Sequence, residues 1–232
     1  MKIQITFLAV GLLVGCGGKK DEPAGGDKTS SGKPVEDKPV VPSGPFAEFG
    51  RNDDILMKFQ GAWVLETGSL GHYEAWEIKG NKVTSWDGKK EQTRELQIDA
   101  PCAAQVVEKS NGGSSSNHMT FVFEGDKLHT GMGDAGIKKG DKILACGSGK
   151  IFVWDGKACV AHANMFGRWE NEATECKLEG TKFTAKRPGM GNMSSEFQIA
   201  GDLLLDDQMK RNKVEKAASY AEAKTKLETF KK

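Results

Sequence analysis

Short runs of β-prone residues follow one another along the chain after Pro45, at intervals of roughly eight to twelve residues. Gly, Asn and Asp separate the runs, and three hairpins have sequences that are typical of tight turns. These turns are Gly80-Asn81, Glu124-Gly125-Asp126 and Asp155-Gly156. The pattern predicts a mainly β domain over residues 46–232, an antiparallel meander that forms either a barrel or a sandwich.

The end of the chain has a helical pattern instead. Ser219 and Glu222 have the spacing of a capping box, and apolar residues recur there at steps of three and four. The apolar stripe consists of Tyr220, Ala223, Leu227 and Phe230. We expect a helix over about residues 219–231 that lies against the sheet rather than on a membrane, because Glu222 and Glu228 interrupt its basic face.

Two parts of the β region resemble each other. Three segments recur in the same order, at residues 61–63 and 167–169, 80–84 and 180–184, and 95–98 and 196–199. An internal duplication, with repeat units at about 61–162 and 167–218, explains this order. Chance similarity between short hairpins is the alternative.

The N-terminus has the pattern of an export signal. A positive start at Met1-Lys2 precedes an apolar run over residues 3–14, which is too short to cross a hydrocarbon core of roughly 30 Å as a helix. The run ends in Leu13-Val14-Gly15-Cys16, which resembles the lipobox of bacterial lipoproteins. The resemblance implies that residues 1–15 are a lipoprotein signal peptide and that Cys16 carries lipid. The alternative is a plain signal peptide with a chance cysteine.

Residues 17–45 lack the side chains that build a core. They contain five of the seven prolines and six glycines, and valine is their only branched apolar residue. We therefore expect residues 16–45 to be a lipidated cysteine and a disordered tether. Because Gly17 rather than Asp comes after the cysteine, the segment resembles those sorted to the outer membrane. The expected location is thus the outer membrane of a bacterial cell envelope, facing the periplasm or the cell surface.

The charges of the chain balance almost completely, with 33 Lys and Arg residues against 32 Asp and Glu residues. No excess charge is available to attract a nucleic acid or a membrane surface. We therefore expect no nucleic-acid partner, and a membrane contact only through the lipid on Cys16.

The other four cysteines are an even number in a chain expected to be exported, which favours two disulfides. Four cysteines allow three pairings. A hairpin about Gly167 would bring Cys159 opposite Cys176, which leaves Cys102 to pair with Cys146. The competing interpretation is a metal site formed by Cys146, Cys159 and His162.

A short helical segment over residues 53–59 precedes Gly61-Ala62-Trp63, and Gly167-Arg168-Trp169 repeats the Gly-x-Trp pattern. This pattern resembles the opening of lipocalins and related calycin barrels, in which the tryptophan packs across the closed end. The resemblance implies a ligand cavity. The candidate ligand-binding residues are Trp63, Trp76, Phe121 and Trp169. The alternative is that these tryptophans are simply core residues.

The sequence has none of the common catalytic signatures. Its four histidines occur without a Gly-x-Ser-x-Gly elbow or a His-Glu-x-x-His helix. Residues 131–136 match a dinucleotide-binding pattern in letters, but residues 137–141 predict a turn rather than the helix that such a site requires. We therefore expect no enzymatic activity, no cofactor and no metal.

The favoured function is a membrane-anchored envelope lipoprotein that binds a small apolar ligand or a peptide. The alternative is a structural or protein-interaction lipoprotein of the envelope with a filled core. An enzyme of unrecognised type is the third hypothesis.

Overall fold

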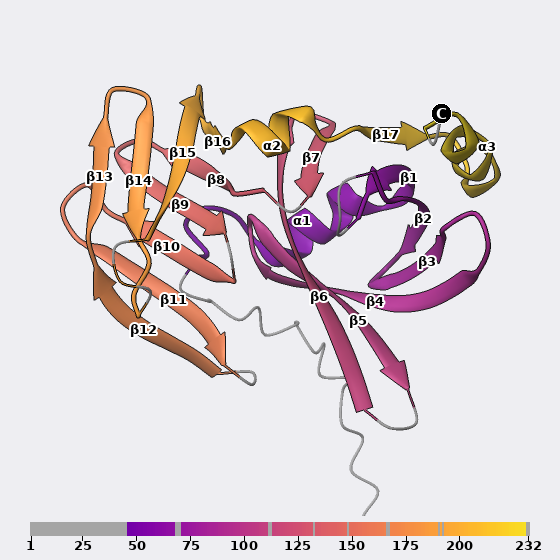
Figure 1. The fold of residues 1–232 in the computed structure, drawn as a ribbon, viewed down its shortest axis with the longest axis horizontal. Helices are drawn as coiled ribbons and strands as arrows, with labels where there is room; N and C mark the ends of the chain where they lie inside the picture. Colours follow the sequence, from indigo (N-terminus) through magenta and orange to yellow (C-terminus); the bar gives the residue numbers. More distant parts are fainter. Residues whose placement is uncertain are drawn as a thin grey trace, which may run out of the picture. The chain divides into compact units, whose positions relative to one another are not determined.

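The computed structural model describes residues 46–67, 71–110, 113–131, 133–147, 149–165, 168–189, 191 and 193–230. The predicted signal peptide, Cys16 and the predicted tether lie outside these residues. All the described elements belong to the same unit of the chain. They form two antiparallel sheets and three helices (Figure 1).

The first sheet is a meander whose edge is completed by a strand from the end of the chain. Its strands are β1 (Gly61–Glu66), β2 (Tyr73–Lys79), β3 (Lys82–Trp86), β4 (Glu91–Ala100), β5 (Ala103–Ser110), β6 (Gly113–Glu124), β7 (Lys127–Gly131) and β17 (Val214–Ala217). Strand β17 pairs with β1 and also contacts β7. The two edges of the sheet therefore approach each other, and the sheet is nearly closed.

The second sheet is also a nearly closed antiparallel meander. Its strands are β8 (Ala135–Lys139), β9 (Lys142–Gly147), β10 (Lys150–Trp154), β11 (Cys159–Met165), β12 (Arg168–Thr174), β13 (Cys176–Glu179), β14 (Lys182–Lys186), β15 (Ser194–Ala200) and β16 (Leu203–Leu205). Its edge strands, β12 and β13, are separated in sequence only by Glu175. The carbonyl of Glu175 accepts a hydrogen bond from the N–H of Lys186 (2.9 Å), which continues the ladder at this bend.

The helices are α1 (Asn52–Phe59), α2 (Asp207–Arg211) and α3 (Tyr220–Phe230). Helix α1 buries Ile55 and Phe59 against the core of the first sheet, and α2 comes after the last strand of the second sheet. The prediction of a mainly β chain, with an antiparallel meander and a C-terminal helix, is confirmed. The meander takes a barrel-like form, and the chain builds two such sheets.

The segments that resemble each other in sequence form hairpins in both sheets. The turns at Gly80 (φ +59°) and Gly180 (φ +60°) both place a glycine in the left-handed region, which other residues rarely adopt. However, the first seven strands of the first sheet end at Gly131 and the second sheet begins at Ala135, so the boundary lies inside the first predicted repeat unit. Strand β17 of the first sheet lies inside the second predicted unit.

The strand after each of these hairpins pairs in a different register. Lys82 pairs with Glu95 in the first sheet, whereas the matching Lys182 pairs with Gln198 in the second. The sequence match aligns Glu95 with Glu196. The strand partner of Lys182 therefore lies two residues further along the chain than the match predicts. The shift preserves the inward and outward phase of the strand, because side chains alternate with a period of two. An ancestral duplication stays a prediction.

The two disulfides join Cys102 to Cys146 and Cys159 to Cys176, which is the predicted pairing. The hairpin of β11 and β12 pairs Cys159 with Thr174, and Cys176 follows two residues later at the start of β13, with its Cα 5.7 Å from that of Cys159. The Cys102–Cys146 bond links the β4–β5 turn of the first sheet to β9 of the second, inside a buried cluster that both sheets share. The alternative metal site is wrong, because the sulfurs of Cys146 and Cys159 are bonded in different disulfides.

The chain passes from the first sheet to the second between Gly131 and Ala135, and the described residues of this crossing are closely packed. A Cβ atom on Gly133 would lie 2.7 Å from Cγ of Met209 and closer still to the carboxylate of Asp206. That carboxylate accepts hydrogen bonds from the backbone N–H groups of Asp134 (2.8 Å) and Met209 (2.6 Å), which ties the crossing to α2. Strand β8 begins at Ala135, so the prediction of a turn over residues 137–141 is wrong for residues 137–139, which pair with β9. The dinucleotide-like pattern therefore leads into a strand rather than into a phosphate-binding helix.

Helix α3 covers the outer face of β1 and β2. The buried cluster beneath it includes Val64, Ala75, Ala223 and Leu227. At its start the N–H of Glu222 donates to Oγ of Ser219 (3.2 Å), while the Glu222 carboxylate accepts from the N–H of Ala218 (3.0 Å). The predicted apolar stripe thus lies against the sheet. None of the helices in the described part of the chain has both the length and the apolar content needed to span a bilayer.

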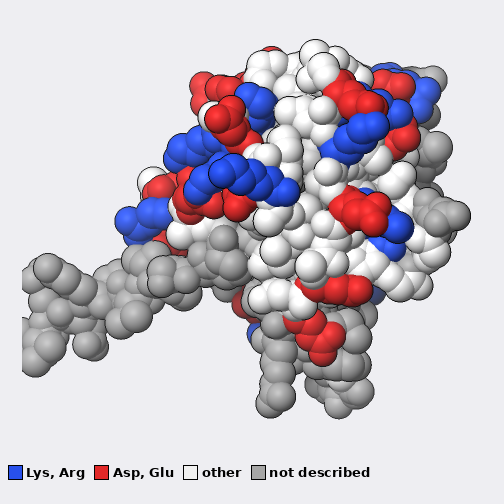
Figure 2. All heavy atoms as spheres, turned by 90° about the vertical axis from the view of Figure 1, so that its left-hand side faces the viewer, with Lys and Arg blue, Asp and Glu red and all other residues white. Residues whose placement is uncertain are grey.

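Charged side chains of both signs are interspersed on the side of the molecule shown in Figure 2. Strands β13 to β15 carry ion pairs such as Lys177 with Glu179 (2.6 Å between nitrogen and oxygen) and Lys182 with Glu196 (2.8 Å). As far as it is described, this face therefore presents no extended field of one sign.

Replacing Gly133 by Ala should lower the free energy of unfolding by about 1–3 kcal/mol, because the added methyl group has no room beside Asp206 and Met209. Urea unfolding followed by circular dichroism measures the change. Gly140→Asn is the control, since Gly140 has a φ of +60° that asparagine tolerates and no atom within 4 Å of an added Cβ. A Gly133→Ala protein as stable as the wild type would contradict this packing.

Candidate functional site

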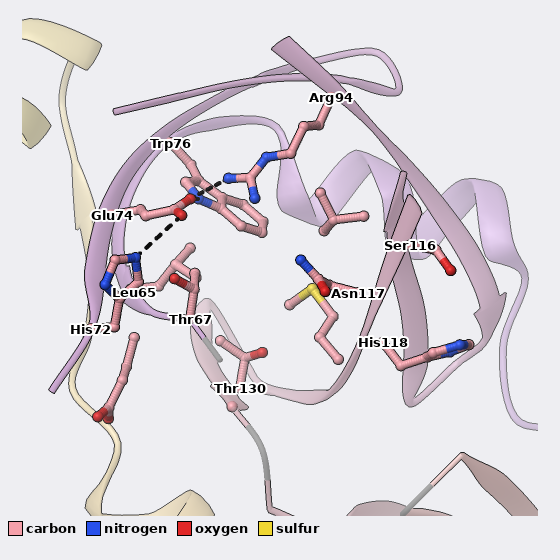
Figure 3. A pocket seen from close by; sticks show the side chains of 14 residues that line it. Leu65, Thr67, His72, Glu74, Trp76, Arg94, Ser116, Asn117, His118 and Thr130 are labelled. Atoms are coloured by element: carbon pink, nitrogen blue, oxygen red, sulfur yellow. Dashed lines mark hydrogen bonds and ion pairs between the residues drawn. The ribbon is translucent and has the colours of Figure 1, made fainter. Parts of the chain in front are cut away.

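The inner side of the first sheet borders a cavity of about 460 Å³ (Figure 3). This volume falls in the range of sites that hold small molecules. Strands β1, β2 and β4 to β7 contribute its walls. The lining residues that matter for its chemistry are Leu65, Glu66, Thr67, His72, Glu74, Trp76, Arg94, Val106, Asn117, His118, Met119 and Thr130.

The alternation of side chains along β2 places Glu74 and Trp76 on the cavity side of the strand. Tyr73 and Ala75 lie on the opposite side and pack in the cluster beneath α3. Both faces of β2 therefore lie against other parts of the protein. One of its inward-facing side chains, that of Glu74, is nevertheless a carboxylate. Burial and the nearby charge of Glu66 raise the pKa of the Tyr73 hydroxyl, in that order of importance.

The Glu74 carboxylate is the centre of a buried polar cluster. Its Oε2 accepts hydrogen bonds from Nε1 of Trp76 (2.6 Å) and from Nη2 of Arg94, and Nη2 also donates to Oγ of Ser85 (2.6 Å). The guanidinium lies 5.4 Å from the centre of the Trp76 ring. The side chains of Arg94 and Glu74 are only 8% and 11% exposed. Such burial removes two charges from water, a cost that these hydrogen bonds offset.

Part of this cluster has no partner. Nε of Arg94 and Oγ1 of Thr67 are buried and make no hydrogen bond within the described part of the chain. Both hydrogen bonds donated by the guanidinium to described residues come from Nη2, and the guanidinium group points into the cavity (Figure 3). An unsatisfied buried polar group costs about 1–3 kcal/mol, so the cavity favours an occupant that accepts hydrogen bonds.

Histidines lie on two sides of the cavity. Nε2 of His72 is 3.6 Å from Oε1 of Glu74, and the His72 side chain is half exposed, so this ring stands between the polar cluster and solvent. His118, on β6, points away from Trp76 and Glu74 (Figure 3). It lies near Asp99, whose pKa is raised chiefly by burial and lowered in part by a hydrogen bond from Gln105 (2.8 Å) and by the His118 charge.

The structure brings together some of the predicted ligand-binding residues. Trp76 lines the cavity, whereas Trp63 and Phe121 are buried in the same core cluster without lining it. Trp63 donates from Nε1 to the carbonyl of Phe59 (2.8 Å), and the ring of Phe121 meets that of Phe59 edge-on. Trp169 is in β12 of the second sheet, and its side chain lies outside the described part. If Trp63, Trp76 and Phe121 all bound a ligand, an apolar cavity would lie between them. The observed cavity lies beside Trp76 alone and is partly polar.

Glu74, Arg94, His72 and Thr67 were not among the site residues predicted from the sequence. One signal for Glu74 was available, because it stands two residues before Trp76 and would share its phase in a strand that leads to the Gly80-Asn81 turn. A carboxylate in the inward phase of a strand needs a buried partner. That the partner is Arg94, two strands away, depends on the pairing of β2, β3 and β4.

Comparison of this chain with models of protein families, with curated proteins and with solved structures found no match. The geometry of the cavity is therefore the basis on which a function can be proposed.

Other groups that could carry chemistry are accounted for by the fold. Within the described residues no cluster of three or more His, Cys, Asp or Glu side chains could hold a metal ion. His162 is buried and meets the ring of Phe46 edge-on at 5.1 Å. Burial lowers the pKa of His162, and a hydrogen bond with Asn171 opposes this effect. This histidine is a buried residue of β11.

Asp134 lies at the crossing between the sheets. Burial raises the pKa of its carboxyl, against a hydrogen bond from Ser195 and the charge of Arg187, and the nearby Asp206 raises the pKa further. Nη2 of Arg187 is 3.6 Å from the carboxylate. The backbone N–H of Asp134 donates a hydrogen bond to the Asp206 carboxylate. We therefore assign Asp134 a role in joining the sheets.

An Asp134→Asn variant should gain stability relative to the wild type as the pH rises above 3.8, the ordinary pKa of an aspartate. The raised pKa means that the folded protein binds this proton more tightly than the unfolded chain, so stability from the group is lost as the pH rises through the folded-state pKa. Urea unfolding of both proteins from about pH 3.5 to about pH 7 measures the difference. The exposed Asp202→Asn variant is the reference for removing one charge. A difference that falls with pH would mean that the Arg187 charge outweighs burial.

Proposed function

We propose that this protein is a non-enzymatic lipoprotein of a bacterial envelope that binds a small, largely apolar ligand in the cavity of its first sheet. The observation that carries the binding proposal is the cavity itself, in which apolar walls surround a guanidinium whose Nε has no hydrogen-bond partner among the described residues. The anchoring proposal rests on the sequence of residues 1–16.

The chemistry of the cavity supports a ligand that is mostly apolar with one polar end. Leu65, Val106, Met119 and the face of Trp76 supply apolar surface, which favours burial of hydrocarbon or an aromatic ring. The polar cluster of Glu74 and Arg94 lies on one side of this surface (Figure 3). Ligand sites typically combine such apolar walls with a few placed polar groups that fix orientation.

The alternative of a structural or interaction lipoprotein with a filled core is less well supported. It predicts tightly packed interiors, whereas the first sheet leaves space beside Trp76. A peptide ligand would have to insert a narrow end, since the cavity volume of about 460 Å³ is that of a small-molecule site.

The anchor would act independently of the cavity. Burying acyl chains contributes about 0.8 kcal/mol per methylene, so a cysteine with two or more chains holds a protein stably on a membrane. The segment after Cys16 would, as a flexible chain, give a reach of roughly 30 Å between the bilayer and the folded domain.

The neutral apolar dye N-phenyl-1-naphthylamine should bind the protein saturably, with a rise in dye emission and quenching of tryptophan emission, because Trp76 lines the cavity. Met119→Trp should weaken binding at least roughly tenfold, about 1.4 kcal/mol, by filling the space. Ser194→Trp, at an exposed position on β15 of the second sheet, is the matched control and should bind as the wild type does. Equal binding by all three proteins would place the dye outside the cavity and contradict the proposal.

A Cys16→Ser protein expressed in a bacterial host should fail to incorporate labelled fatty acid and should leave the detergent phase on phase partitioning, because the thiol is the proposed acylation site. The wild type should be labelled and should enter detergent. Labelling of the Cys16→Ser protein would rule out acylation at this residue.

A further inference from the structure

We infer that the cavity selects a ligand with a neutral hydrogen-bond acceptor, such as an amide or ester carbonyl, over one with a carboxylate or an amine. This inference rests on the proposed function, since it specifies the polar end of the ligand that the cavity would hold. The preference comes from the arrangement of charges around Arg94.

At the polar end of the cavity, Nε of Arg94 has no hydrogen-bond partner among the described residues, whereas Oε2 of Glu74 already accepts two hydrogen bonds. Glu74 already accepts from Trp76 and Arg94 at Oε2, while its Oε1 faces His72 at 3.6 Å. Among the described residues the guanidinium of Arg94 donates only from Nη2, although a guanidinium has five N–H groups. A ligand in this position therefore gains most by accepting a hydrogen bond from Arg94.

The positive charge of Arg94 is already balanced. Glu74 is in direct contact with it, and both side chains are about nine-tenths buried. A second carboxylate, Glu66, also lines the cavity, is buried, and accepts a hydrogen bond from the N–H of Gly71. An anionic ligand would add a third negative charge to these two carboxylates, in a region of low dielectric.

A cationic ligand is disfavoured as well. An ammonium group placed at the polar end would lie against the guanidinium of Arg94, and the accepting positions of Glu74 Oε2 are occupied. A neutral carbonyl avoids both repulsions and satisfies a guanidinium donor. Arg94 and Glu74 thus act together, with Arg94 as the donor and Glu74 as the residue that sets the preferred charge of the ligand.

Competition against N-phenyl-1-naphthylamine with three ligands of equal chain length tests this assignment. Decanamide should displace the dye at a concentration at least tenfold lower than decanoate or decylamine at pH 7. If the dye itself does not bind, the proposed function fails. If the dye binds but decanoate or decylamine competes as well as decanamide, the head-group assignment is overturned while the proposed function stands.

A change of one charge provides the second arm. Glu74→Gln keeps the side-chain shape and an oxygen that can accept from Trp76, but leaves Arg94 without its counter-charge. It should therefore raise the affinity for decanoate relative to decanamide by at least tenfold. Glu77→Gln, the same change on the opposite face of β2, should leave the wild-type preference unchanged. Circular dichroism establishes that each variant is folded, and an unchanged preference in folded Glu74→Gln would overturn the role of Glu74.

Discussion

The pairing of β1 with β17 is the contact on which the rest of this structure depends. The edge of a sheet exposes a row of N–H and C=O groups that require partners. For β1 these partners come from Val214–Ala217, a segment that comes after the whole second sheet in the sequence. The chain therefore leaves the first sheet, completes the second and returns. Two hydrogen bonds join the segment that leaves the first sheet to the segment that returns to it. The Asp206 carboxylate accepts from the N–H of Asp134, and the Asn212 amide donates to the carbonyl of Thr130 (2.9 Å).

This closure also determines the surroundings of the cavity. Strand β17 brings Nζ of Lys216 to 5.1 Å from the ring of Trp63, and it leads directly into α3, which covers the outer face of β1 and β2. Glu74 lies on the inner face of β2, where its carboxylate needs a cation. Arg94 supplies it, and the cost of burying the two charges is offset by their contact and by the hydrogen bonds with Trp76 and Ser85. The space beside Trp76 borders this pair, and we propose that the donors of Arg94 determine which ligands the site prefers.

Much of the local structure was predictable because it depends on residues that are close in sequence. The turn at Gly80, the capping residue Ser219 and the pairing of Cys159 with Cys176 each depend on a pattern within about twenty residues. The site was predictable only in part. Trp76 was identified because aromatic residues in strands are often buried, but the same rule selected Trp63 and Phe121, which pack in the core without lining the cavity. Aromatic character predicts that a residue is buried. It does not predict whether that residue lines a cavity or packs inside a filled core.

The sequence by itself determined the mainly β character of the chain, its C-terminal helix, several of its turns and the partners of its cysteines, since alternation with a period of two and a left-handed glycine act within a hairpin. The tertiary structure alone decided that the strands divide into two sheets at residues 131–135 and that Glu74 meets Arg94. Both outcomes depend on sheet closure and on pairing register across several strands. A shift of one residue would reverse the face of every side chain, and the glycines at the crossing act through contacts with residues more than seventy positions away. No local pattern contains that information, because the constraint is the satisfaction of sheet edges by distant parts of the chain.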